Sequence, residues 1–328
     1  YNFAQNTAGG VYSKVMNYLK SAEGPDITIK PFDAWHDKIQ DYDIIHFFVL
    51  KPEFLDQMTL AKKLGKKIVT SSIVTIADSK KARLKIGLSK FFHLQSNERI
   101  CQLMLQMTDV IIAETKKEKD YIVDAYAIEP SKIHVIPNGV SEEIQGGDPN
   151  LILSKLKIHQ PFVLQVGRFD SNKNQLSVIR ALRNSDIPLV FVGGADSSSP
   201  EYFEQCKKEA GSNCFFPGWI KHSDPLMASA YAAAKVVVLP SHHEIFGNAI
   251  FEGAMTHSNI VATNVLPLEE FGFSKHVFGV DPNSICEIKA AILSAYDAPI
   301  NEEFSAFVKD RYSLKTVFQK HYNIYKSL

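Results

Sequence analysis

Short, uninterrupted apolar runs alternate with longer stretches of helical composition along the whole chain, and this alternation restricts the fold more than any other feature. The runs in the first half are YDIIHFFVL, KKIVTSS, DVIIAET and IHVIPNGV, and those in the second half are PFVLQVGRF, IPLVFVGG, CFFPGW and KVVVLP. Continuous apolar character is typical of strands covered on both faces, and helices between strands supply the crossovers of a parallel sheet. The sequence therefore predicts a doubly wound α/β fold.

A chain of 328 residues is longer than one hydrophobic core comfortably fills, which favours two domains. The segment VSEEIQGGDPNLILSKLKIHQP contains Gly146, Gly147 and Pro149, which interrupt regular structure before the next strand. We therefore predict Rossmann-like domains at residues 1–150 and 151–300. Residues 301–328 have helical spacing and are expected to pack back on the first domain. Because parallel sheets bind ligands at the carboxyl ends of their strands, the chemistry is expected in the cleft between the domains.

The composition argues against several other classes of protein. The 36 acidic and 36 basic residues balance, so no long-range field favours nucleic acid as a partner. The four cysteines form no Cys-x-x-Cys pair, and no apolar run approaches 20 residues. We expect no disulfide framework, zinc cluster or membrane span, and a cytoplasmic location fits this pattern.

The stretch SHHEIFGNAIFE places two glutamates on either side of a predicted turn, directly after a buried strand. The N–H groups of a helix that starts at Gly247, Asn248 and Ala249 can bind a phosphate. Glu244 and Glu252 would flank that phosphate, and a carboxylate can accept hydrogen bonds from two sugar hydroxyls. Taken alone, this stretch has another interpretation. Glu244 would be solvated, and Glu252 would be present only because a negative charge is favourable near the start of a helix.

A second stretch, VGRFDSNKNQ, also follows a buried strand and carries two cations. Arg168 and Lys173 would lie on the same side of the cleft as Glu244. Two fixed cations there can neutralise a departing diphosphate without a metal ion. Taken alone, a solvated loop explains the same two residues.

The ordered set TAGGVYSKV, DVIIAET, VIPNGV, VGRFDSNKNQ, LVFVGG, FFPGWI and VVVLPSHHEIFGNAIFEGAM extends from Thr7 to Met255. This set resembles the "glycosyl transferases group 1" family, which comprises retaining, nucleotide-sugar-dependent enzymes of the two-domain GT-B architecture. The pair of glutamates after LPS, combined with the Arg and Lys element, is the most specific part of the resemblance.

The resemblance implies a role for each matching residue. It makes Glu252 the ligand of the ribose hydroxyls, Glu244 the residue facing the donor sugar, and Arg168 with Lys173 the clamp on the diphosphate. The resemblance also implies that Gly218, Trp219 and Ile220 form the segment that reads the base. It further implies an N-terminal loop at Gly9 and Gly10, where only glycine permits close approach of the backbone to phosphate or acceptor. The nucleoside-diphosphate sugar is then a substrate, and no cofactor or metal is expected. The segments DYD and HHE lack the context and spacing of metal motifs.

The chain departs from the family at one position. The family commonly has a histidine near the C6 hydroxyl of the donor, where KKIVTSSIVTIAD offers Ser71 and Ser72. This departure leaves open a 6-deoxy sugar, a differently oriented hexose, or a displaced histidine such as His93. We interpret His46, within DIIHFF, as a satisfied strand histidine and not as a catalytic group.

The segment Ser79–Leu94 carries five basic residues interleaved with Leu, Ile and Phe. A basic amphipathic helix can bind an anionic membrane surface, and many members of the family act on lipid-linked acceptors at the cytoplasmic face. A peripheral position at the inner face of the membrane is therefore one expectation. A solvated basic face and a groove for an acceptor phosphate are the alternatives.

The resemblance, together with these residues, implies a glycosyltransferase that moves a hexose-type sugar onto a glycan or lipid-linked acceptor in cell-surface polysaccharide or glycoconjugate synthesis. That the enzyme retains the configuration of the sugar is implied by the resemblance alone. The alternatives that share the nucleotide pocket are a nucleotide-sugar epimerase and a disaccharide phosphorylase. A GT-B subunit that has lost catalysis is the non-enzymatic alternative. The residues do not select a nucleotide base, a sugar or a linkage.

Overall fold

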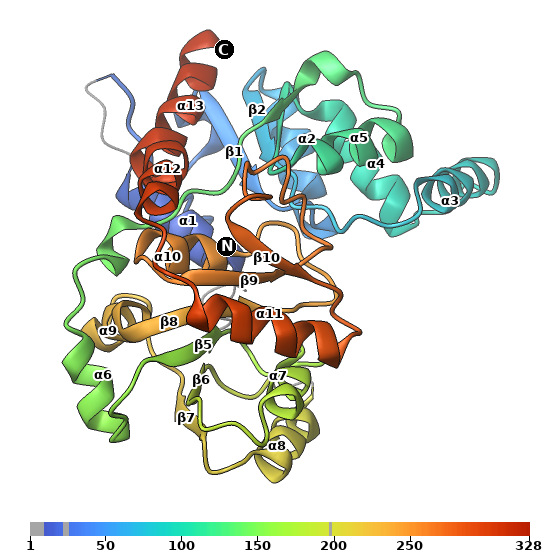
Figure 1. Cartoon of the computed structure of the whole chain (residues 1–328). Helices are drawn as coiled ribbons and strands as arrows, with labels where there is room; N and C mark the ends of the chain where they lie inside the picture. Colours follow the sequence, from blue (N-terminus) through green and yellow to red (C-terminus); the bar gives the residue numbers. More distant parts are fainter. Residues whose placement is uncertain (1–9, 22–25, 197–198) are drawn as a thin grey trace. The chain divides into compact units, whose positions relative to one another are not determined.

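The computed structural model describes residues 10–21, 26–196 and 199–328, and the chain divides into two compact units (Figure 1). Unit 1 comprises residues 1–139 and 314–328, and unit 2 comprises residues 140–313. The division therefore lies at Gly139, earlier than the boundary predicted near residue 150. The predicted C-terminal segment 301–328 is also divided between the two units, because its first helix packs in unit 2 and its second in unit 1.

Unit 1 is built on a parallel sheet with the strand order β1-β2-β3-β4. All four strands correspond to apolar runs of the sequence, at Ile44–Phe48, Lys67–Ser71, Val110–Ala113 and Ile133–Val135. The helices of this unit are α1 Gly10–Lys20, α2 Leu55–Lys63, α3 Ser79–Phe91, α4 Asn97–Met107, α5 Lys116–Tyr126 and α13 Leu314–Ser327, with short 3-10 turns at Ile39–Asp41, Pro52–Phe54 and Pro130–Lys132. Local sequence explains several helix starts, since Asp78, Ser96 and Thr115 each cap a helix with a side-chain oxygen.

Unit 2 is built on a parallel sheet with the strand order β10-β9-β8-β5-β6-β7. Its strands are β5 Phe162–Val166, β6 Leu189–Val192, β7 Cys214–Gly218, β8 Ala234–Leu239, β9 Asn259–Thr263 and β10 Val277–Val280. Its helices are α6 Pro149–Leu156, α7 Gln175–Ala181, α8 Pro200–Glu209, α9 Pro225–Ala233, α10 Asn248–Met255, α11 Ile285–Asp297 and α12 Glu302–Tyr312, with a 3-10 turn at Glu142–Ile144.

The strand order of unit 2 reverses between β5 and β8. After β5, the strands β6 and β7 are added in turn on one side of it. The chain then crosses to the other side of β5, where β8, β9 and β10 follow in turn. Crossovers on the two sides of such a point cover opposite faces of the sheet, which leaves a crevice at the carboxyl ends of the two central strands. The loops after β5 and β8 border that crevice.

Apolar residues that alternate along the strands of unit 2 enter two different cores. Phe162 and Leu164 of β5 pack in one cluster, whereas Val163 between them packs in the other. Because successive side chains of a strand point to opposite faces, the sheet is buried on both sides, as the continuous apolar runs predict. The first cluster includes Phe304 and Val308 of α12, which explains why this helix belongs to unit 2.

Candidate active site

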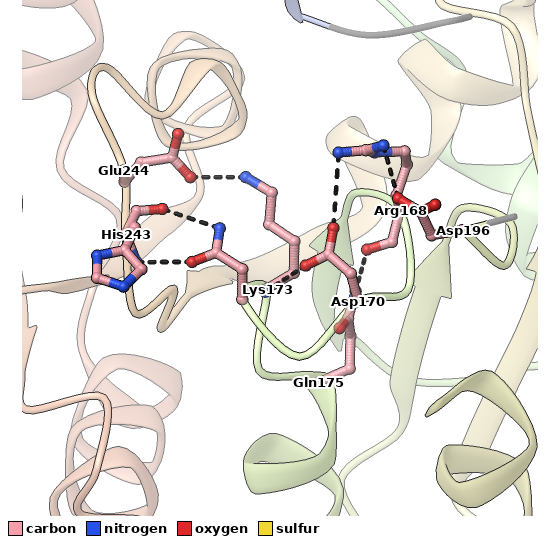
Figure 2. Close-up of polar contacts among 8 residues, drawn as sticks. Arg168, Asp170, Lys173, Gln175, Asp196, His243 and Glu244 are labelled. Atoms are coloured by element: carbon pink, nitrogen blue, oxygen red, sulfur yellow. Dashed lines mark hydrogen bonds and ion pairs between the residues drawn. The ribbon is translucent and has the colours of Figure 1, made fainter. Parts of the chain in front are cut away.

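The loops that follow β5 and β8 carry three of the predicted site residues. The first loop, residues 167–174, holds Arg168 and Lys173, and the second, residues 240–247, holds Glu244. Lys173 Nζ lies 2.6 Å from Glu244 Oε2, and 23% and 15% of the two side chains are exposed (Figure 2). The fold thus pairs an ammonium and a carboxylate that lie 71 positions apart in the sequence.

Arg168 is also paired with carboxylates. Its Nη1 lies 2.6 Å from Asp196 Oδ2, and its Nη2 lies 3.7 Å from Asp170 Oδ2 (Figure 2). The guanidinium is about half exposed, so these pairs are screened by solvent and weak. Each cation predicted to hold a diphosphate therefore has an acidic partner that the diphosphate would replace.

Buried amides hold the backbone that carries these cations. Gln165 of β5 donates from Nε2 to the carbonyl oxygen of Lys173 at 2.7 Å, and Gln175 donates to the carbonyl oxygen of Arg168 at 2.7 Å. Both glutamines are almost fully buried. A Cβ on Gly193, at the end of β6, would lie 1.9 Å from the carbonyl oxygen of Gly167, so this approach of two backbones requires glycine. Contacts with these buried groups therefore fix the backbone of the loop at residues 167–174.

Glu252 lies in α10 and is hydrogen-bonded on both carboxylate oxygens. Tyr231 donates its hydroxyl to Oε2 at 2.5 Å, and Nε2 of His222 lies 3.0 Å from Oε1. Burial, with the nearby Glu252 charge as a second cause, raises the pKa of Tyr231 well above its usual range, so its hydroxyl keeps its proton. Because each carboxylate oxygen has two lone pairs, Glu252 keeps acceptor capacity for further hydroxyls.

The start of α10 lies where the sequence predicts it. Gly247 is the N-cap, with a φ of 78°, in the left-handed region that glycine adopts without strain. Asn248 and Ala249 form the first helical positions, so their N–H groups belong to the helix end that attracts anions.

The predicted base-reading segment follows β7. Gly218 ends the strand with a φ of 83°, Trp219 is about half exposed, and Ile220 is buried in a core of unit 2. The contact of His222 with Glu252 joins this segment to α10. The sequence did not indicate that contact.

The predicted positions of unit 1 are described in part. Gly9 lies outside the described residues, and Gly10 is the first residue of α1. Ser71 Oγ lies 3.0 Å from Nε2 of His46, whose Nδ1 lies 2.6 Å from the hydroxyl of Tyr325. Both ring nitrogens of His46 thus have partners, as expected for a satisfied strand histidine. Burial is the main cause that holds the pKa of His46 well below its usual range, which keeps the ring neutral.

Ser72, the second residue at the family's histidine position, is held by a buried carboxylate. It donates to Glu118 Oε1 at 2.7 Å, and Glu118 also accepts from the backbone N–H groups of Val74 and Glu114 at 2.8 and 2.7 Å. Burial, followed by the nearby Glu114, raises the pKa of Glu118. The two serine hydroxyls therefore take part in hydrogen bonds inside unit 1.

Two features concern metal ions and membrane spans within residues 10–21, 26–196 and 199–328. These residues contain no group of three or more His, Cys, Asp or Glu side chains that could hold a metal ion. Within the same residues, no helix has both the length and the apolar character needed to cross a membrane.

Solved structures show the fold class of the chain. HepE from Anabaena in complex with UDP matches with a TM-score of 0.71 and 16% identity, over 88% of this chain and 80% of that one. Sucrose-phosphate synthase from Thermosynechococcus elongatus matches with a TM-score of 0.70 and 19% identity, over 88% of this chain and 74% of that one. The fold is that of the GT-B glycosyltransferases.

Family models and curated relatives agree with that class. The model for "Glycosyl transferases group 1" matches residues 153–309, and that for "Glycosyltransferase Family 4" matches residues 9–144. The chain belongs to the group 1 glycosyltransferases.

Two curated relatives differ in how far they align. An uncharacterized 41.2 kDa protein in the cps region of Klebsiella pneumoniae is 25% identical over 308 residues, which are 88% of this chain and 80% of that protein. The D-inositol 3-phosphate glycosyltransferase of Kineococcus radiotolerans is 26% identical over 181 residues, which are 50% of this chain and 41% of that enzyme.

Proposed function

We propose that the protein is a retaining hexosyltransferase that moves a sugar from a nucleoside diphosphate to a glycan or lipid-linked acceptor. The observation that carries this proposal is the ion pair of Lys173 and Glu244, 2.6 Å long, which joins the loops after β5 and β8 at the switch point of unit 2, where the first loop also carries Arg168. Two cations suited to a diphosphate and one carboxylate suited to sugar hydroxyls thus lie on loops at the edge where a parallel sheet binds its ligand.

In the proposed reaction, the bond between the anomeric carbon and the diphosphate oxygen breaks as the acceptor hydroxyl attacks from the same face. Arg168 and Lys173 stabilise the negative charge that develops on the leaving diphosphate. The proton of the acceptor hydroxyl passes to an oxygen of that leaving phosphate, so that no protein base is needed. Glu244 orients the donor sugar, and Glu252 orients the ribose. Two cations in these positions supply the charge that a metal would otherwise supply, and we propose no metal or cofactor.

The comparisons support the proposed donor and the proposed biological role. Structural neighbours were solved with UDP and with UDP-glucose, which supports a nucleoside-diphosphate hexose as the donor. The Klebsiella relative from a cps region supports a role in cell-surface polysaccharide synthesis.

The test is a measurement of nucleoside diphosphate release from a panel of nucleotide sugars, with and without glycan and lipid-linked acceptors. We expect release that requires acceptor and falls about 100-fold or more in Lys173→Ala, as for other donors to a developing oxyanion. NMR of the product's anomeric proton would show whether configuration is retained. Product formation without acceptor would indicate an epimerase, phosphate dependence a phosphorylase, and binding without turnover a subunit that has lost catalysis.

We also propose that α3 holds the enzyme at an anionic membrane surface. Ala82, Ile86 and Ser89 form its buried stripe, against α4 and α5. On the other side, four large apolar side chains recur at helical spacing and are 49–77% exposed: Leu84, Leu88, Phe91 and Phe92. Such a stripe on a helix that is already packed on its other face is typical of an interfacial helix.

The basic residues of α3 flank this exposed stripe. By helical geometry, Arg83 and Lys90 lie on one side and Lys85 on the other, although Lys85 pairs with Glu98 at 2.7 Å. Each basic group near an anionic surface contributes about 1 kcal/mol. This arrangement supports a peripheral position at the inner face of the cytoplasmic membrane.

Vesicle sedimentation tests the membrane proposal. The protein should bind vesicles that contain anionic lipid, and the double variant Phe91→Ser with Phe92→Ser should bind much less. A control variant, Leu151→Ser with Ile300→Ser, changes two exposed apolar residues of unit 2 and should bind as the parent does. Equal binding by both variants would contradict this role for α3.

A further inference from the structure

The side chain of Asn172 joins the two loops that carry the candidate catalytic groups. Its Nδ2 donates to the carbonyl oxygen of His243 at 3.0 Å, and its Oδ1 accepts from the backbone N–H of the same residue at 2.7 Å. The backbone carbonyl of Asn172 also accepts from the N–H of His242 at 2.9 Å. Three hydrogen bonds thus cross from one residue of the first loop to two adjacent residues of the second.

These bonds lie directly beside the ion pair. Asn172 precedes Lys173, and His243 precedes Glu244. The ion pair of Lys173 and Glu244, which Figure 2 shows, is therefore the next contact along both loops. The second loop is anchored at its start as well, because Asn174 donates to the carbonyl oxygen of Pro240 at 3.0 Å. The Asn172 amide therefore fixes the residue that precedes Glu244 to the loop at residues 167–174.

The amide group suits this task for a chemical reason. One N–H and one C=O of the same residue must be satisfied together, which requires a donor and an acceptor on one short side chain. A carboxylate at this position would keep the bond to the N–H of His243 but would oppose its carbonyl oxygen. An apolar side chain would make neither bond.

We propose that Asn172 is a positioning residue that sets Glu244 against Lys173 and thereby against the donor sugar. This inference rests on the proposed function. It assigns no contact between Asn172 and the substrate. Its action is through the second loop, so its loss should affect the geometry of the reacting groups more than the binding of the nucleotide.

The experiment compares Asn172→Ala with Asn213→Ala in the full chain. Asn213 also belongs to unit 2 and also joins two segments through its amide, which donates to the carbonyl oxygens of Leu182 and Ile187 at 3.1 and 3.0 Å. Asn172→Ala loses two amide hydrogen bonds, and Asn213→Ala loses two and the weaker one that its Oδ1 accepts from Cys214 Sγ at 3.6 Å. Both variants should therefore melt at a somewhat lower temperature. Only Asn172→Ala should lower kcat, by roughly 10- to 100-fold, since small displacements of reacting groups have effects of that size.

The division between kcat and binding separates positioning from a general loss of structure. In Asn172→Ala the dissociation constant for the nucleoside diphosphate should stay within about threefold of the parent or become smaller, because Lys173 is then less firmly held by Glu244. A kcat equal to that of Asn213→Ala would overturn the inference. So would a parallel loss of kcat and nucleotide affinity.

Two further measurements separate this inference from the proposed function. If Lys173→Ala and Glu244→Gln lower turnover and Asn172→Ala does not, the inference fails and the function stands. If the parent protein transfers no sugar, the function fails, and the inference is then tested by the coupling between Lys173 and Glu244, measured on the unfolding free energies of the variants. The coupling between Lys173 and Glu244 in a double-mutant cycle should be lost in the Asn172→Ala background, and an unchanged coupling would overturn the inference.

Discussion

Replacing Glu244 by glutamine should tighten the binding of a free nucleoside diphosphate while it lowers turnover. In the free protein, Lys173 is held by Glu244 at 2.6 Å. A diphosphate that binds Lys173 must break this ion pair. Glu244, whose side chain is 15% exposed, then has no cation beside it. The intact donor can offset that loss, because its sugar hydroxyls would donate to Glu244, whereas the product diphosphate cannot.

The size of the effect follows from the burial of the pair. Fully exposed ion pairs contribute about 0.2–1 kcal/mol, and hydrogen bonds to charged groups in proteins about 1.5–3 kcal/mol. The side chains of Lys173 and Glu244 are 23% and 15% exposed, between these cases, so we take about 1–2 kcal/mol for the pair. Since 1.4 kcal/mol is a factor of ten, Glu244→Gln should bind the diphosphate roughly 5- to 30-fold more tightly.

Isothermal titration calorimetry at fixed ionic strength measures this effect, with Glu252→Gln as the matched control. Both substitutions remove one negative charge from unit 2, so a purely long-range effect would tighten binding in both. Glu252 has its own partners, Tyr231 and His222, and is predicted to hold the ribose, so its substitution should weaken binding. Tightening in both variants, or weakening in Glu244→Gln, would refute the reasoning.

Three other predictions follow from the structure. A chelator should leave turnover unchanged, because two cations are proposed to supply the charge for the leaving group; a loss of activity on adding EDTA that Mg²⁺ restores would contradict this. The buried His321 has its pKa lowered to about 3 by burial, so the folded state binds fewer protons than the unfolded state, whose value is 6.5. The contribution of His321 to stability should therefore be constant above pH 6.5 and fall by up to about 1.4 kcal/mol per pH unit below it. Denaturation curves of His321→Gln at pH 7 and 5 should show a smaller fall in stability than those of the parent. Gly193→Ala would place a Cβ 1.9 Å from the carbonyl oxygen of Gly167 and should therefore lower the melting temperature. The shift of the backbone should also displace Arg168 and weaken diphosphate binding, and wild-type affinity in this variant would contradict that prediction.

The sequence predicts the fold class and most of the strands, but it does not predict the boundary between the two units. Eight apolar runs became eight strands, because continuous Val and Ile runs have few other stable environments. The strands β9 and β10 were not predicted. Val277–Val280 is only four residues long and includes Gly279, so its apolar character is weak over any window. The unit boundary was placed too late because α6, which opens with Pro149, forms part of unit 2 and is not a linker.

The sequence predicts the charged residues of the candidate site, but it does not predict their partners. Position after a buried strand predicts that Lys173 and Glu244 lie on the same edge of a sheet. Their direct contact depends on the adjacency of β5 and β8, which the order of elements along the chain does not give. The same applies to Tyr231 and His222, which reach Glu252 only through the packing of unit 2.

A thermal-shift screen tests the central claim most directly. The protein and Glu252→Ala would be heated with UDP, GDP, ADP, dTDP and their common sugar conjugates. A ligand present at 100 times its dissociation constant adds about 2.7 kcal/mol of stability, which such a screen resolves. We predict that one nucleotide and its sugar conjugates stabilise the protein and that Glu252→Ala loses the effect. Stabilisation by none of these ligands, or equal stabilisation of the variant, would contradict the assignment of the nucleotide-sugar site.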